Sequence, residues 1–243
     1  MTAVELDPAD SDARETWRNA LDLMKQLEGD WTLIGGLMVQ LHAERYDGAG
    51  ARPTDDVDIL ANSRTRPSYT ERISAKLKQL GFQLSAPVGL DLDTAYRFQR
   101  GDEIVDILGP DGVGSQPPRT VGNLETIQVE GGTQALSRTE RVVVRLDGSE
   151  TEIRCPSLLG AILLKSRSVM RKDREQDRED LIRLLTCVQD PQGMTAGLTA
   201  SERRWLLRAE TKLDFADSGL TSLFSSEQIR LARVTYRLLV AAS

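Results

Sequence analysis

Residues 52–60, with the sequence RPTDDVDIL, place three carboxylates within four positions at the start of an apolar stretch. Side chains of a strand alternate between its two faces, so Asp56 and Asp58 would share one face while Asp55 points to the other. Adjacent carboxylates repel each other, and a divalent cation relieves this repulsion. Mg²⁺ in particular binds one or two carboxylates together with the phosphates of a substrate. The spacing therefore indicates a metal site at Asp56 and Asp58.

A second interpretation of these aspartates needs no metal. They could lie at a strand edge, where they face solvent or pair with Arg45 and Arg52. Asp106, the single acid in the apolar run EIVDIL, bears on this choice, because a neighbouring strand could bring it beside the pair as a third carboxylate. Asp106 could equally be a polar residue on the exposed face of an edge strand. Both interpretations remain open from these residues alone.

Gly35 and Gly36 close the short apolar run WTLIGG, and a helical pattern begins directly after them. Backbone N–H groups in a glycine turn and at a helix N-terminus can approach a chain of phosphates. The only histidine, His42, lies on the helix that follows. It is either a structural residue or a contact to a nucleobase or a phosphate.

Hydrophobic periodicity and turn residues divide the rest of the chain into elements. The first helix has Ser11 as a possible N-cap and Gly29 as its stop, and Pro156 opens a long helix. Residues 109–135 are rich in Gly and Pro and are expected to be irregular. The expected helices cover residues 11–29, 37–46, 68–81, 156–185, 199–214 and 225–242, and the expected strands cover 31–34, 56–61, 94–100, 103–109, 140–148 and 151–155.

This order of elements predicts an α+β fold, in which a mixed β-sheet with helices is followed by a C-terminal helical region. The chain is mostly helical after the last pair of strands, so we expect a boundary near residue 155. Residues 1–155 would form one domain, and residues 156–243 a helical C-terminal domain.

Composition narrows the classes of partner. The 37 acidic residues outnumber the 31 Lys and Arg residues, and the net charge of −6 gives no general attraction to nucleic acids or membranes. Arginines do gather in SERRWLLRAETK and IRLARVTYR, which could follow an RNA backbone or form an ordinary solvated helix face. Cys155 and Cys187 lack a CxxC pattern, so we expect buried thiols. Without a signal sequence or a run of about 18 apolar residues, we expect a cytoplasmic protein with no membrane partner.

The motifs LIGGLMVQLH, RPTDDVDIL and VDIL occur in the order that characterises the nucleotidyltransferase fold shared with DNA polymerase beta, and the chain resembles that family. The later stretch KSRSVMRKDREQDREDL resembles the AbiEii-type toxins of type IV toxin–antitoxin systems. In those toxins a Lys and a downstream Asp-x-x-Asp-Leu follow the catalytic strands, and here these are Lys165, Asp177, Asp180 and Leu181. The resemblance covers roughly residues 30–186 and makes residues 1–155 the catalytic domain.

The resemblance implies roles for individual residues. Asp56 and Asp58 would hold Mg²⁺, and Asp106 would act as a base or as a ligand to a second ion. Four residues would contact a nucleoside triphosphate, whose phosphates would lie near the glycine turn and Lys165. Those residues are Gly35, Gly36, Thr54 and Lys165. Lys165 would also neutralise charge that develops on the phosphates, and the catalytic set would be Asp56, Asp58, Asp106, Lys165 and Asp177.

The helical motif departs from the family in one position. The family has an Arg directly before its helical Asp, but Gln176 stands here, so Asp173 competes with Asp177 for that role. On an unbroken helix Lys165 and Asp177 would be separated by about 18 Å and would point about 120° apart. Either the helix breaks between them, or they contact different parts of the substrate.

The resemblance implies a toxin that transfers a nucleoside monophosphate from an NTP to an acceptor, with tRNA favoured, and so inhibits translation. A cognate antitoxin would then be a partner. Transfer to a small molecule of the aminoglycoside type or to a protein side chain is an alternative. A third hypothesis is a non-catalytic regulator that binds nucleotide.

Overall fold

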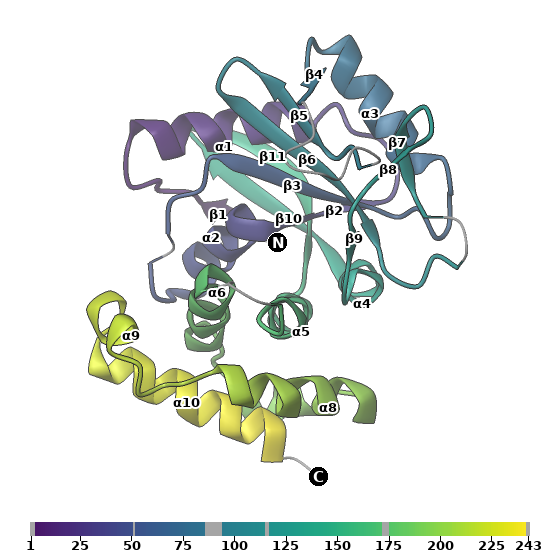
Figure 1. Ribbon diagram of the computed structural model, residues 1–243. Helices are drawn as coiled ribbons and strands as arrows, with labels where there is room; N and C mark the ends of the chain where they lie inside the picture. Colours follow the sequence, from purple (N-terminus) through teal and green to yellow (C-terminus); the bar gives the residue numbers. More distant parts are fainter. Residues whose placement is uncertain (1–2, 51, 86–93, 115–116, 172–174, 242–243) are drawn as a thin grey trace.

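The structure, a computed structural model, describes residues 3–50, 52–85, 94–114, 117–171 and 175–241 (Figure 1). A central mixed sheet lies in the upper part of the molecule as drawn. Its strands are, in spatial order, β2 (Trp31–Ile34), β3 (Asp56–Ala61), β6 (Glu103–Pro110), β5 (Arg97–Arg100) and β4 (Gln83–Leu84), and β9 (Gln128–Val129) pairs with the end of β6.

The middle strands β3 and β6 run parallel to each other, and their outer neighbours β2 and β5 run antiparallel to them. Apolar side chains such as Ile59 and Ile107 are fully buried, as expected for strands covered on both faces. The register places Asp58 directly opposite Asp106. Pairing of the two central strands therefore brings together acids that are far apart in the sequence.

A second sheet contains the hairpin of β10 (Thr139–Leu146) and β11 (Ser149–Pro156), joined by β1 (Val4–Glu5) in parallel. Its turn residues Asp147 and Gly148 both have positive φ, the conformation that a tight hairpin turn requires. Both expected hairpins, this one and that of β5 and β6, are confirmed.

The expectation of an irregular segment over residues 109–135 is wrong in part. That segment contains β7 (Arg119–Val121), β8 (Leu124–Glu125), β9 and the short helix α4 (Gly132–Ser137). Strands of two or three residues are too short to show a periodic pattern, which is why the sequence does not reveal them.

The first helix differs in detail from the expected one. α1 (Ser11–Met24) ends before Gly29, and Asp10 rather than Ser11 is its N-cap, because Asp10 Oδ1 accepts a hydrogen bond from the Ala13 N–H at 2.8 Å. Two other helices in this part of the chain, α2 (Gly35–Tyr46) and α3 (Tyr69–Gln79), lie close to the expected positions.

The expected long helix from Pro156 to residue 185 is in fact two helices, α5 (Leu158–Ser168) and α6 (Glu175–Thr186). Pro156 ends β11, and Ser157 caps α5 by accepting a hydrogen bond from the Gly160 N–H. The sequence LLGAILL is apolar on every side because α5 is enclosed by neighbouring elements, namely α2, α4, α6, β11 and the C-terminal helix α8 (Ala200–Ala209).

The remaining helices form a layer below α5 and α6 (Figure 1). They are α7 (Pro191–Thr195), α8, the 3₁₀ turn η1 (Glu210–Lys212), α9 (Ser218–Leu223) and α10 (Ser226–Ala241). α10 packs on α6, and α8 packs on α5. One apolar core continues across residue 155, from Trp17 and Leu33 to Leu181 and Tyr236. No helix in the described ranges is long and apolar enough to cross a membrane.

Candidate active site

The three acids singled out in the sequence meet at the centre of the mixed sheet. One carboxylate oxygen from each of Asp56, Asp58 and Asp106 lies within 4.8 Å of the others. Asp55 points away from them, toward a groove of about 550 Å³ on the opposite face of β3 and β6 that Val57 also lines. The alternation of a strand thus separates one aspartate from the other two, as the spacing predicts.

The turn between β2 and α2 packs directly against this acidic cluster. Gly35 has φ of +71°, and a Cβ on it would overlap the Asp58 carboxylate. A Cβ on Gly36 would lie 2.7 Å from Thr54 Cβ. Only glycine fits at either position. α2 begins at Gly35 without a side-chain cap, so the N–H groups of its first turn are available to an anion beside the acids.

Thr54 is buried next to Asp56. Its hydroxyl donates a hydrogen bond to Asp56 Oδ1 at 2.8 Å, which fixes the orientation of that carboxylate. The structure therefore places Thr54 in contact with a proposed metal ligand. The direct contact to a nucleotide expected from the resemblance stays a prediction.

Lys165 meets its partners because the chain breaks between α5 and α6. Its Nζ lies 2.8 Å from Asp177 Oδ1 and 2.8 Å from Asp180 Oδ2. Burial alone would lower the pKa of Lys165, but the Asp180 and Asp177 carboxylates raise it above its usual value. The break resolves the distance problem of an unbroken helix. The competing Asp173 lies outside the described residues.

Arg97 is a residue of the site that the sequence did not indicate. Its Nε and Nη2 donate hydrogen bonds to the two oxygens of Asp106 at 2.8 Å each, and Nη2 also donates to Asp56 Oδ2 at 3.2 Å. The hairpin of β5 and β6 pairs position 97 with position 106. Counting back from the turn at Gly101 and Asp102 would have revealed this pairing.

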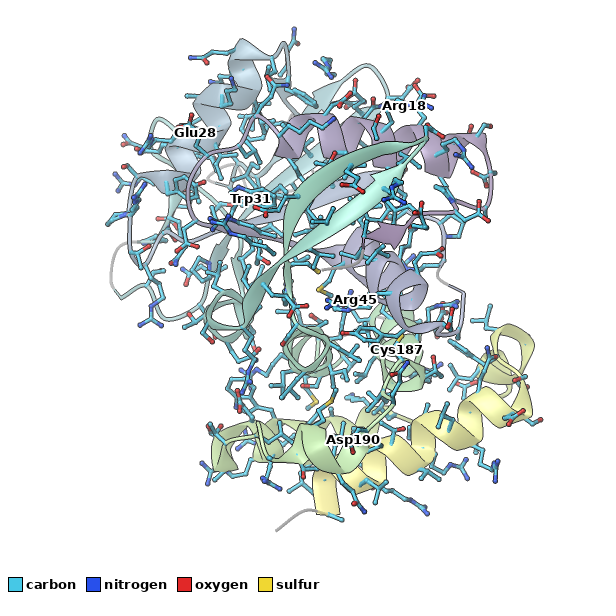
Figure 2. All side chains as sticks on the ribbon, turned by 180° about the vertical axis from the view of Figure 1, so that it is seen from behind. Arg18, Glu28, Trp31, Arg45, Cys187 and Asp190 are labelled. Carbon is cyan, nitrogen blue, oxygen red and sulfur yellow. The ribbon has the colours of Figure 1, made fainter. Side chains whose placement is uncertain are left out.

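The arginines considered as partners of the aspartates from the sequence bind other carboxylates. Arg45 pairs with Glu140, and Arg52 Nε lies 3.4 Å from Asp180 Oδ1. Figure 2 labels Arg45, which lies near the end of α2, and Cys187, the residue that follows α6. The pairing of these aspartates with Arg45 and Arg52 is therefore not found among the described side chains, and β3 lies between β2 and β6 rather than at an edge, although Asp55 is exposed as the alternative expected.

The three carboxylates of the cluster differ in their electrostatic surroundings. Among the described side chains, none forms an ion pair with Asp58. Burial, together with the negative charges of Asp56 and Asp106, raises the pKa of Asp58 to about 7. Burial also raises the pKa of Asp106, although its hydrogen bonds from Arg97 act in the opposite direction.

These groups line one cavity of about 260 Å³, to which Tyr96, Arg171 and Gln176 also contribute. The described residues in and beside this cavity include five carboxylates and four cations, and Asp58 pairs with none of these cations. The carboxylates are those of Asp56, Asp58, Asp106, Asp177 and Asp180, and the cations are Arg52, Arg97, Lys165 and Arg171. The oxygens of Asp56, Asp58 and Asp106 lie close enough to share one ion, and such hard oxygen atoms suit a divalent cation such as Mg²⁺. The donor set therefore fits the metal that the resemblance implies.

His42 and the two cysteines lie away from this cavity. His42 is buried, its Nε2 lies 3.0 Å from the Pro156 carbonyl oxygen, and burial lowers its pKa to about 4. Of the two expectations for His42, the geometry agrees with the structural one. Cys155 and Cys187 are free and buried, as expected.

Neither a family model nor a curated protein matches the sequence. Its arrangement in space is similar to the crystal structure of an antigenic nucleotidyltransferase-like protein from Paracoccidioides brasiliensis, with a TM-score of 0.50 and 14% sequence identity, over 90% of this chain and 93% of that chain. The chain has a nucleotidyltransferase-like fold. The solution structure of the antibiotic-resistance factor ANT(2'')-Ia is also similar, with a TM-score of 0.42 and 15% identity, over 88% of this chain and 96% of that chain.

The nucleotidyltransferase-like fold confirms the expected α+β class, a mixed sheet with helices followed by a helical C-terminal region. In this structure the acidic cluster and the glycine turn lie together at the central sheet. The narrower resemblance to the AbiEii-type toxins finds no match in these comparisons.

Proposed function

We propose that this protein is a divalent-cation-dependent nucleotidyltransferase that uses an NTP as its donor. The observation that carries the proposal is the cluster of Asp56, Asp58 and Asp106, whose oxygens lie within 4.8 Å of one another beside an uncapped helix N-terminus. Carboxylates in such an arrangement serve metal-assisted phosphoryl and nucleotidyl transfer, in which positioning and charge stabilisation supply most of the catalysis.

Each residue has a defined task in this reaction. Asp56 and Asp58 would hold Mg²⁺, which when bound neutralises negative charge on the triphosphate. Thr54 keeps the Asp56 carboxylate oriented, and the N–H groups at Gly35 and Gly36 would bind the β- and γ-phosphates. By binding the triphosphate in this way, these residues would orient the α-phosphorus toward the attacking hydroxyl.

The transfer step itself needs a base and a leaving group. The acceptor hydroxyl oxygen forms a bond to the α-phosphorus as the bond to pyrophosphate breaks, and Asp106 accepts the proton of that hydroxyl. Lys165 lines the same cavity and is our candidate contact for the triphosphate, with Asp177 and Asp180 holding its ammonium in place. Lys165 would stabilise the negative charge on the departing pyrophosphate.

We propose tRNA as the acceptor and inhibition of translation as the outcome, with a cognate antitoxin as partner. Support comes from the resemblance of the helical motif to AbiEii-type toxins. The exposed arginines of α8 and α10 add local positive charge to an acidic protein, namely Arg204, Arg208, Arg230 and Arg237. A polycationic small molecule would favour an acidic cleft, whereas the cavity mixes carboxylates with Arg52, Arg97, Lys165 and Arg171.

The direct test is incubation of the protein with each α-labelled NTP, Mg²⁺ and total tRNA. We expect label to appear in tRNA with the wild-type chain and to fall at least about 100-fold with Asp58→Asn. Retention of full activity by Asp58→Asn would remove Asp58 from the mechanism. Metal-dependent nucleotide binding without transfer to tRNA, small molecules or protein would instead favour the regulator.

A growth assay tests the toxin assignment separately. Expression of the wild-type chain without a partner should slow growth, whereas Asp56→Ala should not. Equal toxicity of the two chains would point to aggregation or sequestration rather than to catalysis.

A further inference from the structure

Arg97 holds the acidic cluster in a way that competes with a metal ion. Its planar fork occupies both oxygens of Asp106 and reaches one oxygen of Asp56. This two-pronged contact is the strongest geometry that an arginine makes with a carboxylate. While it persists, both oxygens of Asp106 accept a hydrogen bond and share the charge of the guanidinium, so Asp106 binds a cation or a proton less tightly than a free carboxylate would.

The Arg97 side chain can leave Asp106 without burying its own charge, provided that another cation takes its place beside the carboxylate. The Arg97 side chain is 39% exposed, whereas that of Asp106 is only 7% exposed. Arg97 also lines the cavity, so a released guanidinium would remain in contact with solvent or with a bound phosphate. A guanidinium does not lose its proton near neutral pH, so release requires displacement.

The three acids differ in how firmly Arg97 holds them. Asp106 receives two hydrogen bonds of 2.8 Å, Asp56 receives one of 3.2 Å, and Asp58 forms no ion pair with a described side chain. Asp56 and Asp58 are therefore open to a cation first. Asp106 becomes available only when a competing charge replaces the arginine.

We propose that Arg97 is a built-in competitor of the divalent cation, which withholds Asp106 from metal binding and from proton transfer until metal and nucleotide displace it. This inference rests on the proposed function and extends it, because it assigns a positioning residue outside the motifs that indicated the site. It predicts that the resting protein binds divalent cations less tightly than its three carboxylates alone would.

The test is a titration of the full-length protein with Mn²⁺, followed by the electron paramagnetic resonance signal of free Mn²⁺, without nucleotide. Arg97→Met removes the competing charge and keeps an apolar stem of similar length. Arg100→Met is the matched control, since Arg100 lies on the same strand and pairs with Glu103 away from the cavity. We expect Arg97→Met to bind Mn²⁺ about tenfold more tightly, or to bind an additional ion, as expected for an interaction of about 1.4 kcal/mol.

Thermal unfolding gives a second measurement that does not depend on activity. Without metal, Arg97→Met should be less stable than wild type because the acids repel each other, and Mn²⁺ should raise its melting temperature more than that of wild type. Arg97→Lys, which keeps one charge but lacks the planar fork, should lie between the two. It replaces Arg97→Met if the latter fails to fold.

The possible outcomes separate the inference from the function on which it rests. Equal or weaker Mn²⁺ binding by Arg97→Met relative to Arg100→Met, in a protein whose wild type binds Mn²⁺ and transfers nucleotide, overturns the inference alone. Absence of Mn²⁺ binding in every variant overturns the metal-dependent function and the inference with it.

Discussion

Asp58 is the residue on which the chemistry of the site depends most directly. It packs against Gly35, forms no ion pair with a described side chain, and has two other carboxylates as neighbours. Such a group is costly to ionise in the folded protein and gains most from a bound cation. Its titration should therefore be visible in the stability of the protein.

The first prediction concerns stability against pH. The pKa of Asp58 is about 7 in the folded protein and near 4 in an unfolded chain. The folded state thus binds more protons between these values, so the contribution of Asp58 to the free energy of unfolding falls as the pH rises from about 4 to about 7. Asp58→Asn lacks this contribution, and its stability relative to wild type should increase over that range by roughly 2–4 kcal/mol.

Urea denaturation of both chains at several pH values measures this difference, because titrating groups away from the cluster contribute equally to the two chains. Saturating Mg²⁺ should reduce the difference, because the cation favours ionised Asp58. Parallel stability curves for the two chains in metal-free buffer would show that Asp58 titrates normally.

The second prediction concerns Lys165. Lys165→Met leaves Asp177 and Asp180 buried without the ammonium that lies 2.8 Å from each, and should destabilise the protein by about 3–5 kcal/mol. Lys25→Met is the control, because Lys25 pairs with Asp22 at the exposed surface and should cost less than about 1 kcal/mol. Denaturant unfolding measures both. Equal stability of the two variants, with nucleotide binding lost only in Lys165→Met, would make Lys165 a phosphate contact rather than a structural ion pair.

At the scale of single elements, the join between β2 and α2 is the most constrained part of the site. Gly35 has positive φ, and a side chain there would displace the Asp58 carboxylate. Gly81 also has positive φ, but a Cβ on it would meet nothing closer than 3.7 Å. Substitution of Gly81 therefore tests backbone strain alone, whereas substitution of Gly35 tests strain together with displacement of the Asp58 carboxylate.

The third prediction compares these glycines. Gly35→Ala and Gly81→Ala should each lose about 1–2 kcal/mol from the strain of a left-handed alanine. Only Gly35→Ala should also weaken Mn²⁺ binding, by about tenfold or more, because the metal ligand must move. Melting temperatures and Mn²⁺ titrations of the two variants provide the comparison. Unchanged Mn²⁺ binding in Gly35→Ala would show that Asp58 is not a ligand.

The elements also show where sequence reasoning succeeds. The acidic strand and the hairpin of β5 and β6 follow from alternation and from a tight turn, both of which are local signals. The sequence leaves open whether Asp106 joins the pair or faces solvent on an edge strand, and the parallel pairing of β3 with β6 brings it beside Asp56 and Asp58. Fold class follows from the same pattern.

The parts that the sequence does not reveal depend on contacts between distant elements. The break between α5 and α6 lies within one continuous helical pattern, and no proline or glycine marks it. It allows Lys165 to pair with Asp177 and Asp180. Arg97 was missed because an arginine on a strand carries no motif, although the register of its hairpin was already implied.

At the scale of the whole molecule, α5 and α6 join the sheet to the C-terminal helices (Figure 1). α6 packs on α2 and on α10, and α5 packs on α4 and α8. Lys165 and Asp177 contribute to the cavity from this middle layer. The division into residues 1–155 and 156–243 stays a proposal about folding units, and it can be tested directly.

The fourth prediction is that residues 1–155 alone do not fold cooperatively. This fragment would lack α5 and α6, both of which pack on α2 in the full chain, and would leave part of that buried helix uncovered. Circular dichroism during urea denaturation should show a broad transition, in contrast to the full-length protein. A sharp transition with native-like Mn²⁺ binding would establish residues 1–155 as an independent domain.

The separation of the cavity residues along the chain also matters while the protein is being made. The ribosome produces Gly35 and the three acids well before Lys165 and Asp177, and the exit tunnel delays the later residues further. The acidic pocket therefore lacks one wall throughout most of synthesis. Chains stalled on the ribosome before residue 165 should bind no nucleotide, so any harmful activity would begin only when translation of the protein is almost complete.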